Sequence, residues 1–266
     1  MKITIIGCGN MGLIYARAFL KYNIVSKDNL LLAEKNETRK SELLKFDIGK
    51  VCVVDDKRIS ESDIVILAVK PQDFNDMSEG LKKVLTSDNI IISIMAGMKL
   101  ERIESVLMQK NIIRAMPNSP AELGMGMTAF TSSKDMSIEQ IRKAENLLAT
   151  TGRTVFFENE ALLDAVTALS GSGPAYFFYV VKHMIEAGKK MGFDESTSAM
   201  LVKQTMLGSY HLINNANKSL DDLIKAVASK GGTTEAALSV FNEKEVGENL
   251  QNGIVKARDR AMELSK

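Results

Sequence analysis

Short apolar runs alternate with amphipathic segments along residues 2–157. The runs are rich in Ile and Val and contain few polar residues, a pattern typical of strands that are buried on both faces. Helices are predicted between several of them, at Met11–Lys21, Thr38–Phe46 and Asp73–Leu85. The predicted strands are Ile3–Ile6, Leu30–Ala33, Val51–Val54, Ile64–Val69, Ile90–Ile94 and Ile112–Ala115. This alternation predicts an α/β fold with a parallel, doubly wound sheet and right-handed crossovers.

The pattern changes after Glu158, and residues 160–266 contain no convincing strand. Apolar residues recur at three- and four-residue spacing in Ala175–Met191, Glu195–Asn215 and Glu243–Leu264, which predicts helices. Many of these helices are apolar on more than one face. Their total apolar surface is more than a small domain can bury in its own interior. We therefore expect an all-α C-terminal domain that buries its surplus against a second subunit. Packing against the first domain is the alternative.

The composition is that of an ordinary soluble protein, with 45% hydrophobic and 25% charged residues in a chain of 266. A formal net charge of +1 gives no reason to expect nucleic acid or an anionic membrane as a partner. The apolar stretch at the N-terminus is too short for a signal peptide, and no run approaches the roughly 18 apolar residues of a membrane span. We expect a cytoplasmic protein.

The few residues with metal-binding or nucleophilic potential indicate no metal site. Cys8 and Cys52 fall in predicted buried positions, so free thiols are favoured over a disulfide. His183 and His211 have no Cys or acidic neighbour at ligand spacing, and neither has a clear case as a catalytic residue.

The segment GCGNMG follows the first predicted strand and opens the first predicted helix. Gly7, Gly9 and Gly12 have the G-x-G-x-x-G spacing of the Rossmann-type dinucleotide fold, where they allow a tight turn, close approach of a pyrophosphate, and close helix–strand packing. An ordinary glycine turn is the alternative. We predict a dinucleotide-binding Rossmann domain at residues 1–158 and a helical dimerisation domain at residues 159–266. The predicted phosphate-binding turn comprises Ile6, Gly7, Cys8, Gly9, Asn10, Met11 and Gly12.

The end of the second strand bears on the choice between NADH and NADPH. Glu34 lies where an acid hydrogen-bonds the adenosine ribose hydroxyls, which favours NADH. Lys35 and Arg39 follow at once and could instead hold the 2′-phosphate of NADPH, although Arg39 also fits a solvated charge at a helix start. Both cofactors therefore stay open, with Glu34 favouring NADH.

Three further turns with Gly or Pro follow successive strands, which is typical of a ligand cleft at the carboxyl edge of a sheet. They are AVKPQ, where Pro71 is expected to end the strand and start a helix, ISIMAGM, and a loop fixed by Pro117 and Pro120. Simple turn chemistry is the alternative for the prolines. The predicted cofactor contacts in these turns are Ala68, Val69, Lys70, Pro71, Met95, Ala96, Gly97 and Asn118.

Five motifs in this order, GCGNMG, AVKPQ, RAMPNSPAELGMG, TALSGSGPAYFF and SKGGTTEAAL, resemble those of pyrroline-5-carboxylate reductases. The resemblance spans essentially the whole chain, and the last two motifs are the most specific. It implies NAD(P)H-dependent reduction of L-1-pyrroline-5-carboxylate to L-proline, the last step of proline biosynthesis. It also implies a homodimer through the helical domain, alone or within a ring of dimers.

The same resemblance implies that the Gly-Gly-Thr-Thr turn forms part of the substrate pocket beside the nicotinamide. If Thr233 or Thr234 caps a helix that begins near Glu235, the glycines expose backbone N–H groups to the substrate carboxylate. Thr234 matches the family's pocket threonine, which implies a hydrogen bond and proton donation to the ring nitrogen. A turn that merely caps a helix is the alternative. The expected substrate-binding residues are Val227, Ser229, Gly231, Gly232, Thr233 and Thr234.

Three positions depart from the family pattern. Lys230 stands where the family often has proline, which predicts a looser turn. Asp55, an expected cofactor contact, stands where an asparagine commonly meets the adenosine. Glu34–Lys35 replaces the more usual polar or basic pair, so the last two departures bear on cofactor choice.

Two other functions remain open from the residues. A β-hydroxyacid dehydrogenase shares this domain order and needs a lysine in the helical half, where Lys182, Lys189 and Lys203 are available. The second alternative is a non-catalytic relative that binds a dinucleotide as a sensor. Intact GCGNMG and GGTT motifs argue against this alternative.

Overall fold

The computed structural model describes residues 1–264. The chain forms two compact units by its internal contacts. The first comprises residues 1–172 together with the C-terminal stretch from residue 257, and the second comprises residues 173–256. The domain limits of 1–158 and 159–266 stay a prediction.

An eight-stranded sheet forms the centre of the first unit, in the order β3-β2-β1-β4-β5-β6-β7-β8. All neighbouring strands are parallel except β6 and β7, which are antiparallel. The strands are β1 (Ile3–Ile6), β2 (Leu30–Ala33), β3 (Lys50–Cys52), β4 (Ile64–Leu67), β5 (Ile90–Ser93), β6 (Ile112–Met116), β7 (Gly126–Ser132) and β8 (Gly152–Phe156). The order reverses between β1 and β4, which makes this point the topological switch of a doubly wound fold. The predicted fold class is confirmed.

The sequence pattern located β1 to β6 and missed β7 and β8. Strand β7, GMTAFTS, buries Thr128 and Thr131 together with its apolar residues, so no apolar run marks it. Strand β8 lies at one edge of the sheet and is only partly buried, so it also lacks such a run. The antiparallel β6–β7 pair was likewise not expected.

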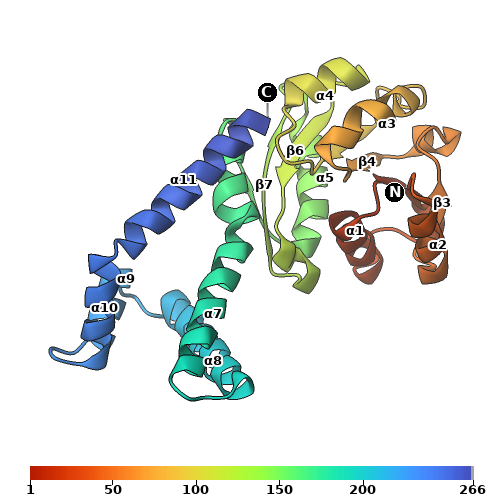
Figure 1. Ribbon diagram of the computed structural model, residues 1–266. Coiled ribbons are helices and arrows are strands. Elements are labelled where there is room, and N and C mark those ends of the chain that lie inside the picture. The colour runs from red at the N-terminus through yellow and green to blue at the C-terminus, as the bar shows by residue number, and fades with distance from the viewer. Residues whose placement is uncertain (265–266) are drawn as a thin grey trace. The chain divides into compact units, whose positions relative to one another are not determined.

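Helices cover both faces of this sheet (Figure 1). On one face, α1 (Asn10–Lys21), α2 (Glu37–Phe46) and α5 (Ile138–Leu148) contribute to one buried cluster with residues of the sheet. On the other, α3 (Phe74–Leu81) and α4 (Leu100–Leu107) contribute to a second. Each fully buried Ile, Leu or Phe side chain stabilises the fold by about 1.5–3 kcal/mol. Short 3₁₀ turns connect these elements at Lys27–Asn29 (η1), Lys57–Glu61 (η2), Pro71–Asp73 (η3), Ser119–Leu123 (η4) and Ala149–Thr151 (η5).

A buried ion cluster joins strand β6 to the segment that follows the sheet. Arg114 on β6 is 3% exposed and donates to Glu160 (2.9 Å) and Asp164 (2.6 Å). The same Glu160 oxygen accepts the Leu100 N–H at the start of α4 (2.9 Å). Asp164 lies on α6 (Leu162–Val166), which continues into a π-helical turn at Thr167–Gly171. Because a buried charge is tolerated only when paired, this cluster fixes α6 and the π-helical turn against the sheet.

The second unit is helical, with α7 (Gly173–Lys190), α8 (Glu195–Asn215), α9 (Leu220–Val227) and α10 (Thr233–Glu243). Helix α11 (Val246–Leu264) begins in this unit and ends in the first. Residues 160–264 contain no strand, as predicted. The helix expected from Glu243 starts at Val246 instead, because Glu245 adopts a positive φ of 52° and interrupts it.

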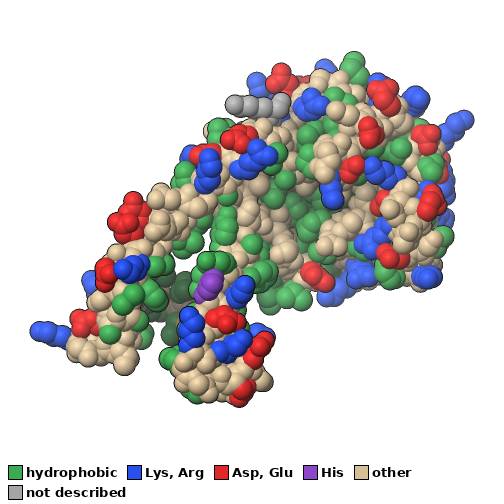
Figure 2. Space-filling model, in the orientation of Figure 1, with side chains coloured by type: hydrophobic (Ala, Val, Ile, Leu, Met, Phe, Trp, Pro, Cys, Tyr) green, Lys and Arg blue, Asp and Glu red, His purple; other side chains and the backbone are tan. Residues whose placement is uncertain are grey.

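The second unit has no apolar core of its own. Across residues 173–256, all of which the structure describes, no side chain larger than that of Ser198 is buried. Figure 2 shows hydrophobic side chains on the surface of α7. Large exposed apolar residues include Phe177, Phe178, Tyr179, Leu207, Tyr210, Ile224 and Phe241, each 48–68% exposed. Apolar surface on this scale indicates burial against another surface.

None of the helices within residues 1–264 combines the length and the hydropathy needed to cross a membrane.

Candidate functional site

A cavity of about 510 Å³ opens at the carboxyl ends of β1, β2 and β4. We call it the switch-point cavity because it lies where the strand order reverses. Such a position is where open α/β sheets bind their ligands. Ala33 at the end of β2 lines it, together with eight of the predicted cofactor residues: Ile6, Gly7, Gly9, Glu34, Lys35, Ala68, Val69 and Lys70.

The turn from β1 to α1 depends on glycines at two positions. Gly7 has a positive φ of 87°, and a Cβ there would lie 2.6 Å from Val69 Cγ1. A Cβ at Gly12 would lie 2.3 Å from the Gly7 carbonyl oxygen. Only the absence of these side chains lets α1 start this close to the strand.

The N-terminus of α1 has the features of an anion site. Gly9 is its N-cap, no side chain in the described chain caps it, and its first turn carries no acid. Its first N–H groups therefore remain free to bind an anion, and the helix dipole favours negative charge there. A Cβ built on Gly9 would meet nothing within 4 Å, so the space that a pyrophosphate needs is present. These residues fit a dinucleotide.

Glu34 lies directly after β2, beside the glycine turn. Its Oε2 accepts the Cys8 N–H at 3.1 Å, and its Oε1 accepts the N–H groups of Lys35 (2.8 Å) and Asn36 (3.0 Å). Three backbone donors therefore fix the carboxylate at the wall of the switch-point cavity.

The basic residues near Glu34 are each engaged by an acid. Lys35 pairs with Asp73 at 2.6 Å, and this hydrogen bond raises the pKa of Lys35 above its ordinary value. Arg39 donates to the Cys8 carbonyl (2.8 Å) and to Glu42 (2.6 Å), so its guanidinium supports the glycine turn. Lys40, which the sequence did not single out, also lines the cavity and pairs with Glu37 at 2.7 Å.

The two cysteines are buried free thiols, as predicted. Burial, with a smaller effect from the charge of Glu34, raises the pKa of Cys8 to about 12. Burial also raises the pKa of Cys52 to about 11. Because the thiolate is the nucleophilic form, neither cysteine is suited to covalent catalysis at neutral pH.

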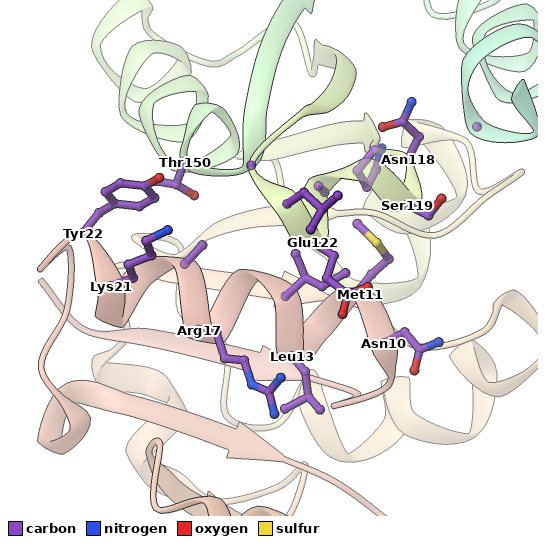
Figure 3. A pocket seen from close by; sticks show the side chains of 17 residues that line it. Asn10, Met11, Leu13, Arg17, Lys21, Tyr22, Asn118, Ser119, Glu122 and Thr150 are labelled. Carbon is purple, nitrogen blue, oxygen red and sulfur yellow. The ribbon is translucent and has the colours of Figure 1, made fainter. Parts of the chain in front are cut away.

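A larger cavity of about 970 Å³ lies between α1 and η4, and we call it the α1–η4 cavity. Figure 3 shows Asn10, Met11, Asn118 and Ser119 on one side of it and Lys21, Tyr22 and Thr150 on the other. The end at Asn10 is formed by the start of the same helix that borders the switch-point cavity. One extended ligand could therefore reach both cavities around the α1 N-terminus.

Asn118 has a structural role that the sequence did not reveal. Its Nδ2 donates to the carbonyl and the hydroxyl of Ser170, both at 3.2 Å, and its Oδ1 accepts the Met127 N–H at 2.9 Å. It thus fastens the η4 loop to the π-helical turn, whose Gly171 lines the same cavity. Single π-helical turns are frequent at functional sites.

Several predicted cofactor residues lie outside the linings of these two cavities. They include Cys8, Gly12, Asp55, Pro71, Met95, Ala96 and Gly97. Gly97, with a φ of 72°, lies against the last described turn of α11, where a Cβ would be 3.3 Å from the Leu264 carbonyl oxygen. Strand β4 ends at Leu67, so Pro71 starts η3 without ending the strand.

The Gly-Gly-Thr-Thr turn precedes α10 in the second unit. Gly231 adopts a φ of 73°, Gly232 is the N-cap, and Thr233 and Thr234 are the first two helical residues. The expected threonine cap is wrong, because the helix starts two residues before Glu235 and no described side chain caps it. Ser229 lies against Gly232, while Val227 ends α9 with 68% of its surface exposed.

Glu235 is a residue of this turn that the sequence reasoning missed. Its Oε2 accepts the Gly231 N–H at 2.6 Å. The Glu235 carboxylate thus already accepts one of the N–H groups that are expected to bind the carboxylate of the substrate. The available signal was an acid at the third helical position, a common partner for free N–H groups at a helix start.

Two family models match the chain. The one described as "Pyrroline-5-carboxylate reductase dimerisation" matches residues 160–264. The one described as "NADP oxidoreductase coenzyme F420-dependent" matches residues 2–97.

Full-length relatives match as well. The pyrroline-5-carboxylate reductase of Haemophilus influenzae is 34% identical, and the match covers 98% of this chain and 97% of the relative. That of Aquifex aeolicus is also 34% identical, with 99% and 97% covered. The crystal structure of the Plasmodium falciparum pyrroline carboxylate reductase with NADP bound is similar at a TM-score of 0.89 and 25% identity, covering 100% of this chain and 98% of that one.

Two glycine variants distinguish a position that leaves space for the ligand from one that the fold itself requires. We expect Gly9→Ala to fold normally, because its Cβ meets nothing, yet to bind NADH and NADPH about tenfold or more weakly, because the methyl group enters the pyrophosphate space. Gly12→Ala should instead lower the midpoint of thermal unfolding, since its Cβ would strike the Gly7 carbonyl. Calorimetric titration and thermal melts of both variants measure this. Unchanged cofactor binding by Gly9→Ala would place the pyrophosphate elsewhere.

Proposed function

Because this chain belongs to the pyrroline-5-carboxylate reductase family, we propose that it reduces L-1-pyrroline-5-carboxylate to L-proline with NADH or NADPH. The observation that carries the proposal is the uncapped N-terminus of α1 beside the switch-point cavity, in a chain that reductases match over its full length. The assay is oxidation of NADH and of NADPH, measured separately, with pyrroline-5-carboxylate supplied.

The first unit binds and orients the dinucleotide. The free N–H groups at the start of α1 hold the pyrophosphate, and Gly9 leaves room for it. Glu34 marks the adenosine end, and the cavity end at Asn10, Met11 and Asn118 suits the nicotinamide. When bound, the reduced nicotinamide supplies the hydride that adds to C5 of the cyclic imine.

The second unit supplies the groups for the substrate's carboxylate. The N–H groups of Gly231, Gly232 and Thr233 lie at a turn and a helix start, where backbone donors and the helix dipole favour an anion. Glu235 must release the Gly231 N–H before a substrate carboxylate can accept it.

Thr234 is the proposed proton donor. As hydride adds to C5, the ring nitrogen gains the electron pair of the C=N bond and needs one proton to become the amine of proline. A hydroxyl that hydrogen-bonds this nitrogen positions the imine and gives it a proton, and a proton from solvent restores the hydroxyl. Most of the rate enhancement comes from orientation and exclusion of water, so no strong base is required.

The apolar helices of the second unit form the proposed homodimer interface. The exposed Phe, Tyr, Leu and Ile side chains of α7, α8, α9 and α10 require a partner surface, and the matched model for residues 160–264 is one of dimerisation. A ring of dimers is the larger assembly that we propose from the same family.

The β-hydroxyacid dehydrogenase alternative loses one of its three candidate lysines, Lys189. Its lysine base needs a pKa near the working pH. Lys189 pairs with Glu186 at 3.3 Å, and that hydrogen bond raises the pKa of Lys189 above its ordinary value. This shift is opposite to the one that a lysine base needs.

Replacing the proposed proton donor tests its role. Thr234→Ala should lower kcat about 10²-fold because the ring nitrogen loses its donor, while the Kd for the cofactor stays unchanged. Thr234→Ser keeps the hydroxyl and should recover most of the rate. Ser239→Ala, which removes a hydroxyl on the same helix, is the matched control. Steady-state kinetics with pyrroline-5-carboxylate decides, and an unchanged kcat in Thr234→Ala would remove Thr234 from the chemistry.

Removing the carboxylate on Gly231 should help the substrate to bind. Glu235→Ala frees this N–H, so we expect the KM for pyrroline-5-carboxylate to fall about threefold or more with kcat little changed. Glu243→Ala, which removes an acid at the other end of α10, controls for the general change in charge. A KM that rises in Glu235→Ala would instead make Glu235 a contributor to substrate binding.

A further inference from the structure

The carboxylate of Glu34 occupies the place in the switch-point cavity that decides between the two nicotinamide dinucleotides. It adjoins the end of β2, where the register pairs Ile6 with Ala33, so it lies next to the glycine turn. In this fold, the adenosine ribose meets the residue after the second strand. The 2′ position of that ribose carries a hydroxyl in NADH and a phosphate in NADPH.

The carboxylate is fixed where it is. Its two oxygens accept three backbone N–H groups, from Cys8, Lys35 and Asn36, at 2.8–3.1 Å. Turning it aside to admit a phosphate would leave these donors without their acceptor, which carries a desolvation cost. A carboxylate offers about four acceptor positions, so room remains for a ribose hydroxyl to donate to it.

Three of the cationic side chains that could counter a 2′-phosphate, those of Lys35, Arg39 and Lys40, are already engaged by acids. Lys35 pairs with Asp73 at 2.6 Å and Lys40 with Glu37 at 2.7 Å. Arg39 is directed to Glu42 and to the Cys8 carbonyl. Asp76 adds a further acid to the cavity wall, while Lys70 is a lining cation with no ion pair in the described chain.

We infer that this chain selects NADH over NADPH and that Glu34 sets the selection. The inference rests on the proposed use of a nicotinamide dinucleotide and adds the identity of the cofactor. The 2′-hydroxyl of NADH donates to Glu34, whereas the 2′-phosphate of NADPH meets a fixed negative charge with no free arginine beside it. The exposed Lys35–Asp73 pair opens at little cost, but opening it does not remove the charge of Glu34.

Binding without substrate tests the selection independently of catalysis. The chain contains no Trp, so isothermal titration calorimetry is the measurement of choice. We expect NADH to bind the unaltered protein about tenfold or more tightly than NADPH at low salt. Raising the ionic strength should narrow this ratio, because salt screens the repulsion of the phosphate. Equal affinities, or tighter binding of NADPH, would overturn the inference without any variant.

Two variants with the same change of charge locate the effect. Glu34→Gln should reduce the NADH-to-NADPH affinity ratio about tenfold or more, chiefly through tighter binding of NADPH. Asp76→Asn removes one acid from the same cavity away from the Glu34 contacts and should change the ratio about threefold at most. Similar changes in both variants would assign the selection to the cavity's overall charge and contradict a specific role for Glu34.

A failure of the cofactor selection can be distinguished from a failure of the proposed reductase function. Reduction of pyrroline-5-carboxylate with equal efficiency from both cofactors would preserve the reductase and overturn the selection. A clear preference for NADH in binding, with no turnover of pyrroline-5-carboxylate, would preserve the selection and overturn the reductase.

Discussion

The close approach of helix α1 to strand β1 is the constraint on which the rest of the site depends. Gly7 turns the chain at a positive φ, and the missing side chain of Gly12 lets the helix begin against the Gly7 carbonyl. As a result, the first N–H groups of α1 face a cavity at the point where the strand order reverses. Glu34 and Arg39 both bond to the backbone of Cys8, so the same turn holds the acid that we propose to meet the adenosine ribose.

The helical unit meets a different constraint. Its helices carry large exposed aromatic and aliphatic side chains, and residues 173–256 bury little beyond Gly188 and Ser198 where α7 and α8 touch. Exposed apolar surface of this extent indicates that another surface covers it. If that surface belongs to a second copy of the chain, assembly and the proposed catalysis are linked, because the Gly231–Thr234 turn belongs to the unit that assembly covers.

Much of the fold could be predicted because it is encoded locally. Four of the six predicted strands are buried runs rich in Ile or Val, β2 is a buried run of Leu and Ala, and the glycine fingerprint lies between the first strand and its helix. Strand β7 escaped because it buries threonines, and the antiparallel step that it creates has no signal in periodicity. The functions of Asn118, Arg39 and Glu235 could not be predicted, because each depends on a hydrogen bond to backbone whose position only the folded chain sets. The assumed threonine cap failed for a related reason, since the helix start depends on Gly232.

The most direct test follows a labelled hydrogen from the cofactor to the product. NADH deuterated at C4 of the nicotinamide, in separate R and S forms, is incubated with the protein and pyrroline-5-carboxylate, and the proline formed is analysed by mass spectrometry and NMR. A dinucleotide held in one orientation predicts deuterium at C5 of proline from one form and none from the other. Proline without label from either form, or no proline at all, would contradict hydride transfer between the two ligands.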